Sequence, residues 1–92
     1  MNRTLLKDFG FTEYESLLYL TLLSQGPLSA YTLAEKAGLY RQVTYDTLYR
    51  LVEKGLVSSV QEGKSQIFKA LDPALLLATL QEKAEQFKQF LP

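Results

Sequence analysis

Three glycines divide the stretch from Ser29 to Ala70 into segments of different pattern. Gly38 separates two helical patterns, Gly55 follows the second, and Gly63 lies at the centre of an alternating, hairpin-like segment. A helix, a tight turn, a second helix and a hairpin, in this order, are typical of a helix-turn-helix followed by a β-wing. We therefore expect a mainly α fold with a small β-hairpin, in which the second helix of this segment suits the major groove of DNA.

Composition limits the chemistry that this chain can perform. Its 92 residues suffice for one domain, so residues 1–92 are expected to form a single winged helix-turn-helix domain. The sequence has no cysteine and no histidine, which removes disulfides, thiol nucleophiles, imidazole bases and the usual zinc ligands. No cofactor motif is present, so we expect no enzyme, no catalytic residue, no metal and no cofactor.

The sequence also argues against a membrane partner. The most apolar stretch, Ala74–Leu80, is much shorter than the ~20 residues that cross a bilayer. The start of the chain carries charges and lacks an apolar run of signal-peptide length. These features, with the missing cysteines, predict a cytoplasmic protein.

Local sequence signals predict two helices before the segment that the three glycines divide. Residues 3–9 predict a short helical turn, and Thr12 with Glu15 predicts a capping box at the start of a helix that runs to about Gln25. This helix is apolar nearly all round and must be covered on two sides, one by the helix-turn-helix and the other by a terminal helix or a partner chain. Its tyrosines are expected in the core with its leucines: Tyr14, Leu17, Leu18, Tyr19, Leu20, Leu22 and Leu23.

Within the segment, Ser29 is expected to cap a helix that runs to Ala37. The next helix is predicted over about Tyr40–Lys54. Its expected buried face holds Thr44, Leu48 and Leu51, with Val52 beside them. Leu56–Gln61 and Ser65–Ala70 alternate apolar and polar residues, which predicts the two strands of the wing.

The C-terminal helix, within residues 71–92, is expected to begin with Asp72 as cap and Pro73 in its first turn. Its apolar residues follow a 3-4-3-4 spacing that matches a coiled-coil seam: Leu77, Leu80, Ala84, Phe87 and Leu91. The helix can pack on its own domain, or it can form a dimer seam together with the helix that ends near Gln25. We favour the dimer seam, because further apolar residues widen the stripe beyond the need of a monomer.

Charge is unevenly distributed although the chain is neutral overall. Residues 36–69 hold six cations and three anions and so carry a net charge of +3, whereas both ends of the chain are negative. The cations are Lys36, Arg41, Arg50, Lys54, Lys64 and Lys69. A basic excess on the helix-turn-helix and wing is where DNA phosphates would lie.

The exposed side of the second helix supplies the candidates for reading double-stranded DNA. Its N-terminal half should meet bases, through Arg41 to guanine, Gln42 to adenine, and Tyr45. Tyr49 suits a phosphate or a thymine methyl, whereas Arg50 lies further along and suits a phosphate. The remaining candidates for backbone contacts lie outside this helix: Ser29, Tyr31 and Lys64. Each of these residues could instead be a solvated surface side chain.

These residues resemble the N-terminal domain of the TrmB family of transcriptional regulators, over about residues 5–85. The matching strings are Gly10-Phe11-Thr12-Glu13-Tyr14-Glu15, Tyr19, Gly26-Pro27, Ala37-Gly38, Tyr45-Asp46-x-Leu48-x-x-Leu51 and Lys54-Gly55-Leu56-Val57. The resemblance implies a sequence-specific, homodimeric winged-helix DNA binder, in a family that often acts on genes of sugar transport or metabolism. The sugar-sensing domain of full-length members has no counterpart here, so the resemblance assigns no effector.

Two positions depart from the family pattern. Val43 stands where the family often has a basic residue, and Thr44 stands where an aliphatic core residue is usual. Together with Asp46 and the neutral total charge, Val43 supports an alternative function. In this alternative the chain is a winged-helix protein–protein interaction module that does not bind DNA.

Overall fold

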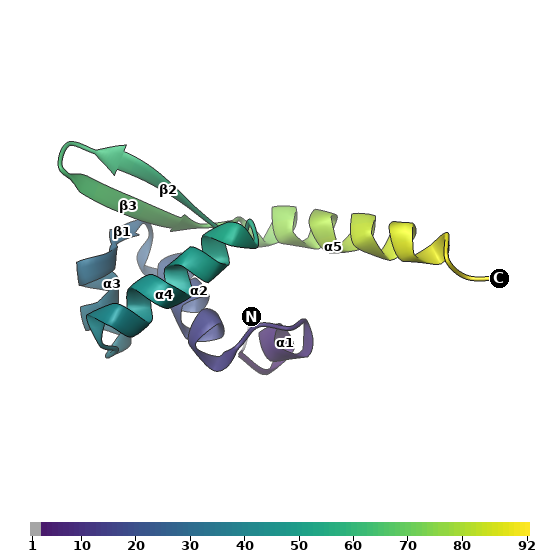
Figure 1. Cartoon of the computed structure of the whole chain (residues 1–92), viewed down its shortest axis with the longest axis horizontal. Coiled ribbons are helices and arrows are strands. Elements are labelled where there is room, and N and C mark those ends of the chain that lie inside the picture. The colour runs from purple at the N-terminus through teal and green to yellow at the C-terminus, as the bar shows by residue number, and fades with distance from the viewer. Residues whose placement is uncertain (1–2) are drawn as a thin grey trace.

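The computed structural model describes residues 3–92, which form five helices and a small antiparallel sheet (Figure 1). In chain order the elements are α1 (Arg3–Asp8), α2 (Glu13–Gln25), β1 (Leu28–Ser29), α3 (Ala30–Ala37), α4 (Arg41–Glu53), β2 (Val57–Glu62), β3 (Ser65–Ala70) and α5 (Pro73–Lys88). The helices α2, α3 and α4 pack together, the hairpin β2–β3 extends from one side, and α5 projects from the other. The predicted fold class, a winged helix-turn-helix, is confirmed.

Helix α2 begins with the predicted capping box. The backbone N–H of Glu15 donates to the hydroxyl of Thr12 at 3.1 Å, and the Glu15 carboxylate accepts from the Thr12 N–H at 2.8 Å. The same carboxylate, fully buried, accepts two contacts from Lys54 Nζ at 2.8 and 2.9 Å. Because Lys54 caps the C-terminus of α4, this ion pair ties the start of α2 to the end of α4.

Helix α4 buries the side that the spacing predicted, with one addition. Thr44, Leu48 and Leu51 are fully buried, and so is Thr47, which the pattern did not place inside. The Thr44 hydroxyl donates to the carbonyl of Tyr40 at 3.0 Å, so a polar residue fits in the core without a lost hydrogen bond. Val52, expected beside this face, is 37% exposed.

The end of α4 explains the glycine that follows it. Gly55 has φ +75°, and its N–H donates to Val52 O while the next N–H, of Leu56, donates to Leu51 O. This is a Schellman motif, which needs a left-handed residue and therefore favours glycine. It turns the chain directly into β2.

The sheet contains a third strand that the sequence analysis did not predict. Its order is β1-β3-β2, with Leu28 opposite Phe68 in one pair and Ser59 opposite Phe68 in the other. Strand β1 has only two residues, too few for a periodic signal. It fastens the wing to the start of α3, because Ser29 is both in β1 and the N-cap of α3.

The core lies between α2, α3, α4 and β3. Tyr19 is fully buried at its centre, its ring packs edge to face on Phe11 at 5.5 Å between centroids, and its hydroxyl donates to Leu71 O at 2.6 Å. Burial, together with the charge of Asp72, raises the pKa of Tyr19. The companion expectation for Tyr14 was wrong, because its side chain is 46% exposed on α2.

Helix α5 starts as predicted and packs on its own domain only over its N-terminal half. Asp72 accepts from the Ala74 N–H at 2.7 Å, Leu76 is buried, and Leu80 is partly buried. Beyond Leu80 every side chain is exposed, and α5 runs away from the body of the molecule (Figure 1). The helix therefore packs on its own domain only as far as Leu80, and the dimer seam stays a prediction. The helix ends at Lys88, so the predicted seam residue Leu91 lies past it.

Candidate nucleic-acid interface

The N-terminal half of α4 presents its predicted readers to solvent. Arg41 and Gln42 are exposed and Tyr45 is partly buried. The Gln42 side-chain amide donates to Asp46 Oδ1 at 3.0 Å, one turn further along. This hydrogen bond fixes the orientation of the Gln42 amide. It also means that the negatively charged Asp46 carboxylate lies beside a predicted base-reading residue.

Four of the predicted contact residues come together around one hollow of about 250 Å³ between the start of α3, helix α4 and the wing. It is lined by Ser29, Ala30, Tyr31, Tyr45, Lys64, Ser65, Gln66 and Phe68. The short strand β1 creates this arrangement, because it brings the start of α3 against β3. Lys64 is thus placed on the same side of the molecule as the predicted base-reading residues.

Ser29 reaches this hollow with its hydroxyl already engaged. Its Oγ accepts from the Thr32 N–H at 3.3 Å and donates to Thr32 Oγ1 at 3.1 Å. The prediction that Ser29 caps this helix is therefore confirmed. Its predicted phosphate contact remains a prediction.

Arg41 makes a contact that the sequence did not indicate. Its Cζ lies 4.9 Å from the centroid of the Tyr31 ring, within the range of a cation–π interaction. The two residues are the first of α4 and the second of α3. The contact therefore joins the starts of the two helices of the helix-turn-helix.

The remaining candidates lie outside the hollow. The rings of Tyr45 and Tyr49 are 6.2 Å apart, so Tyr49, 55% exposed, continues the aromatic surface along α4. Arg50 is exposed and its Nη2 donates to Thr47 Oγ1 at 3.3 Å. These two residues extend the candidate surface toward the C-terminal end of α4.

The start of α4 carries unopposed positive charge. Its N-cap residue, Tyr40, makes no side-chain capping hydrogen bond, and the first turn contains no acidic residue. Free backbone N–H groups and the helix dipole both favour an anion at such an end. Helix α2 differs in both respects, since it has a capping box and two glutamates in its first turn.

Sequence reasoning missed three residues on this surface. Ser65 and Gln66 line the hollow, and Tyr40 is 85% exposed beside Arg41. Ser65 and Gln66 directly follow Lys64, so a predicted wing contact could have been extended to the polar residues after it. No pattern in the sequence distinguishes Tyr40 from a core tyrosine.

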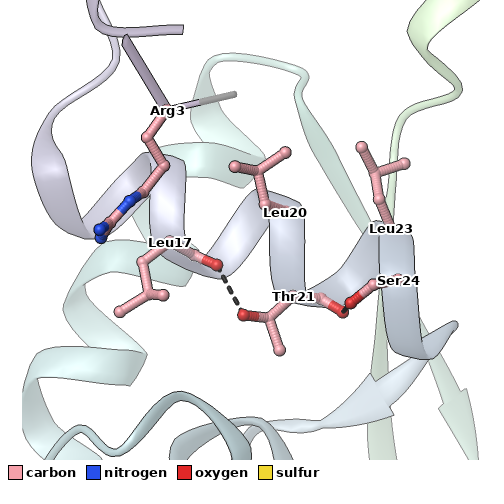
Figure 2. Close-up of a pocket in the computed structure, with 6 residues that line it drawn as sticks. All are labelled: Arg3, Leu17, Leu20, Thr21, Leu23 and Ser24. Carbon is pink, nitrogen blue, oxygen red and sulfur yellow. Dashed lines mark hydrogen bonds between the residues drawn. The ribbon is translucent and has the colours of Figure 1, made fainter. Parts of the chain in front are cut away.

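A second, apolar hollow of about 540 Å³ lies on the outer side of α2 (Figure 2). Leu17, Leu20 and Leu23 line it, with Arg3 from α1 at one end. The hydroxyl of Thr21 donates to Leu17 O at 2.7 Å, so the polar group here is satisfied within the helix. Helix α5 does not cover this side, which leaves the second cover expected for α2 unsupplied within residues 3–92.

Other kinds of site find little support in the described residues. Residues 3–92 contain no cluster of three or more acidic side chains that could hold a metal ion. Over the same range, no helix combines the length and the apolar character needed to cross a bilayer.

The order of elements, the capped turn between α3 and α4, and the three-stranded wing define a winged helix-turn-helix protein. Residues 6–74 match the family described as sugar-specific transcriptional regulator TrmB. The chain therefore belongs to the TrmB family, as the sequence analysis predicted. This is a family of transcriptional regulators and not of enzymes, in agreement with the expected lack of catalysis.

Two relatives share 38% identity with the chain. One is the HTH-type sugar sensing transcriptional regulator TrmBL1 of Pyrococcus furiosus, matched over 77 residues, which are 84% of this chain and 22% of that protein. The other is YrhO of Bacillus subtilis, an uncharacterized protein matched over 82 residues, 89% of this chain and 30% of that protein. The chain thus spans less than a third of the length of either relative.

Solved structures support the same fold. That of TrmBL2, described as an archaeal chromatin protein with a novel mode of DNA binding, matches with a TM-score of 0.80 and 30% identity, covering 95% of this chain and 34% of that one. A MarR family protein of Bacillus stearothermophilus matches with a TM-score of 0.70 over 91% of this chain and 61% of that one. At 24% identity, this second likeness shows the fold alone.

Proposed function

We propose that the chain is a DNA-binding transcriptional regulator that reads a specific sequence as a homodimer. The observation that carries the proposal is the surface on which Arg41 and Gln42 stand exposed beside a hollow lined by Tyr31, Tyr45 and Lys64. Among the cations of residues 36–69, Lys64 lines the hollow and Arg41 stands at the uncapped start of α4. TrmBL2, at 30% identity, is described as binding DNA, which supports the same partner here.

In this proposal α4 enters the major groove. Arg41 donates two hydrogen bonds to guanine O6 and N7, Gln42 reads adenine, and Tyr45 contacts a base edge. Tyr49 and Arg50 meet the backbone further along α4, and Lys64 meets it from the wing.

The direct test is a mobility-shift titration with duplexes selected by the protein from a randomised pool. Recovery of one enriched sequence, bound at least about tenfold more tightly than a scrambled duplex, is the expected result. No binding at low salt, even at micromolar protein, would contradict the proposal. Enrichment without a consensus would leave DNA binding intact and remove sequence specificity.

Two alanine variants should separate base reading from phosphate contact. Arg41→Ala is expected to weaken binding to the selected duplex by about 1–3 kcal/mol and to relax the preference for one base at one position of the site. Lys64→Ala should instead weaken selected and scrambled duplexes alike and lower the salt slope by about one unit, because it removes a phosphate contact. Salt-dependent titrations with both duplexes measure the two effects. An Arg41→Ala variant that weakens both duplexes equally would assign Arg41 to the backbone.

The homodimer rests on two apolar surfaces that the domain leaves uncovered. One is the seam of α5, where Leu77 is 56% and Phe87 73% exposed, and Ala84 also lies in solvent. The other is the hollow on α2 (Figure 2). A second copy that covers both would bury the seam and supply the second side that α2 needs. Two α4 helices could then read half-sites about 34 Å apart.

Phe87→Glu tests this dimer. Placing a charge at an apolar contact should raise the dimer dissociation constant at least about tenfold, because burial of a phenylalanine side chain is worth about 1.5–3 kcal/mol. Gln86→Glu is the matched control, since it adds the same charge beside the seam and should leave the dimer intact. Sedimentation velocity over a range of concentrations distinguishes the outcomes. A monomeric wild-type chain, or a Phe87→Glu variant with wild-type association, would contradict the proposal.

One observation favours the alternative of a protein–protein interaction module: Asp46 places a carboxylate on the exposed side of α4, bonded to Gln42. Affinity capture separates the two functions. A defined protein partner with no enriched DNA would support the module.

A further inference from the structure

The pair formed by Arg41 and Tyr31 has a geometry that matters for sequence reading. The guanidinium carbon lies 4.9 Å from the ring centroid, and the Tyr31 side chain is 53% exposed. The two residues are ten positions apart and come from different helices, so only the turn at Gly38 brings them together. The contact therefore depends on the tertiary arrangement of α3 and α4.

Arg41 stands where its own helix disfavours a cation. It is the first residue of α4, where the helix dipole is positive, and neither an acidic neighbour in the first turn nor a capping side chain offsets that charge. Among residues 3–92, the ion pairs involve Arg3, Lys7, Lys54 and Lys88, and Arg41 belongs to none of them. Its N–H donors therefore remain available to an acceptor outside the chain.

The Tyr31 ring can orient these donors without using them. A guanidinium held by its face against a ring keeps the N–H groups at its edge free for a planar acceptor. Fixing the side chain before binding also reduces the rotamer entropy lost on contact. An oriented arginine favours the paired acceptors of guanine, whereas a freely rotating one can contact phosphate in any sequence.

We propose that Tyr31 is a positioning residue for sequence selectivity, acting through Arg41. This role rests on the proposed function and replaces the direct phosphate contact that the sequence analysis expected of the Tyr31 hydroxyl. The ring, and not the hydroxyl, carries the effect. Loss of the ring should lower selectivity without changing the number of phosphates contacted.

The test compares Tyr31→Leu, which removes the ring, with Tyr31→Phe, which removes only the hydroxyl. Affinities are measured for a duplex selected by the wild-type chain and for a scrambled duplex of equal length. Tyr31→Leu should lower the ratio of the two affinities about three- to thirtyfold, with an unchanged salt slope. Tyr31→Phe should keep the wild-type ratio, and Tyr31→Leu should have no further effect in an Arg41→Ala background.

Three outcomes would overturn the role. Equal losses in Tyr31→Leu and Tyr31→Phe would assign the effect to the hydroxyl, and independent losses from Tyr31→Leu and Arg41→Ala would show that Tyr31 does not act through Arg41. A wild-type chain that binds neither duplex would overturn the proposed function and this role with it. Lys83→Ala, which removes an exposed cation from α5 outside the basic segment, is the control and should keep the wild-type ratio. Circular dichroism melts establish that each variant is folded.

Discussion

Replacing Lys54 with methionine should destabilise the protein by about 2–3 kcal/mol at neutral pH, although Lys54 lies at the surface. The variant leaves the Glu15 carboxylate, which is fully buried, without its cation. Breaking a fully buried pair costs about 3–5 kcal/mol. We expect less here, because the Lys54 side chain is 45% exposed and the Thr12 N–H still donates to Glu15. Urea unfolding at pH 7 measures the difference.

The contribution of Glu15 to stability should depend less on pH in Lys54→Met than in the wild type. Burial alone raises the pKa of Glu15, but the hydrogen bonds from Lys54 and Thr12 and the charge of Lys54 outweigh it, so the pKa lies below its ordinary value. The wild-type contribution is therefore present above the unfolded pKa and is lost as the pH falls through the lower folded pKa. In Lys54→Met only the hydrogen bonds from Thr12 oppose burial, so the pKa of Glu15 should rise relative to the wild type and the variant should lose less stability than the wild type on acidification.

Two further variants control this result. Glu15→Gln in the Lys54→Met background should recover most of the lost stability, because a neutral amide can still accept the Thr12 hydrogen bond. Lys69→Met removes an exposed lysine from β3 and should change stability by no more than about 0.5 kcal/mol. If Lys54→Met matched the wild type at pH 7 and at pH 4, the ion pair would have no role in stability.

Phe68→Ala should lower the free energy of unfolding by about 3–5 kcal/mol, which is the largest effect expected in this chain. Phe68 is 1% exposed at the centre of the sheet, opposite Leu28 on one side and Ser59 on the other. Its loss opens a cavity in the core and weakens the support of both neighbouring strands. This loss is a large share of the free energy of unfolding of a typical protein, which is about 5–15 kcal/mol.

Val60→Ala is the matched control. Because Val60 is 56% exposed on β2, this substitution should lower the free energy of unfolding by at most about 0.5 kcal/mol. Chemical denaturation of both variants provides the comparison. Because Phe68 also lines the hollow at the candidate interface, Phe68→Ala should weaken DNA binding where the variant remains folded. A cost below about 1 kcal/mol would show that Phe68 does not anchor the wing.

Local signals in the sequence predicted most of the helices and the hairpin correctly. Caps, glycines and apolar spacing depend on neighbouring residues alone, which is why Thr12, Gly55 and Asp72 each lie at the element boundary that was predicted. Burial was less predictable where a residue lies at the edge of a helix face. Tyr14 was expected inside and is exposed, because burial there depends on how α2 meets its neighbours.

What the sequence alone determined is therefore the order of the helices and the hairpin strands, the family, and the residues that α4 exposes near its start. The tertiary structure decided which of those residues meet. Strand β1 is too short to predict, yet it brings the start of α3 to the wing and gathers Tyr31, Tyr45 and Lys64 around one hollow. The contact of Arg41 with Tyr31 and the ion pair of Glu15 with Lys54 likewise join separate helices. Such contacts depend on the packing of distant segments, which local spacing does not encode.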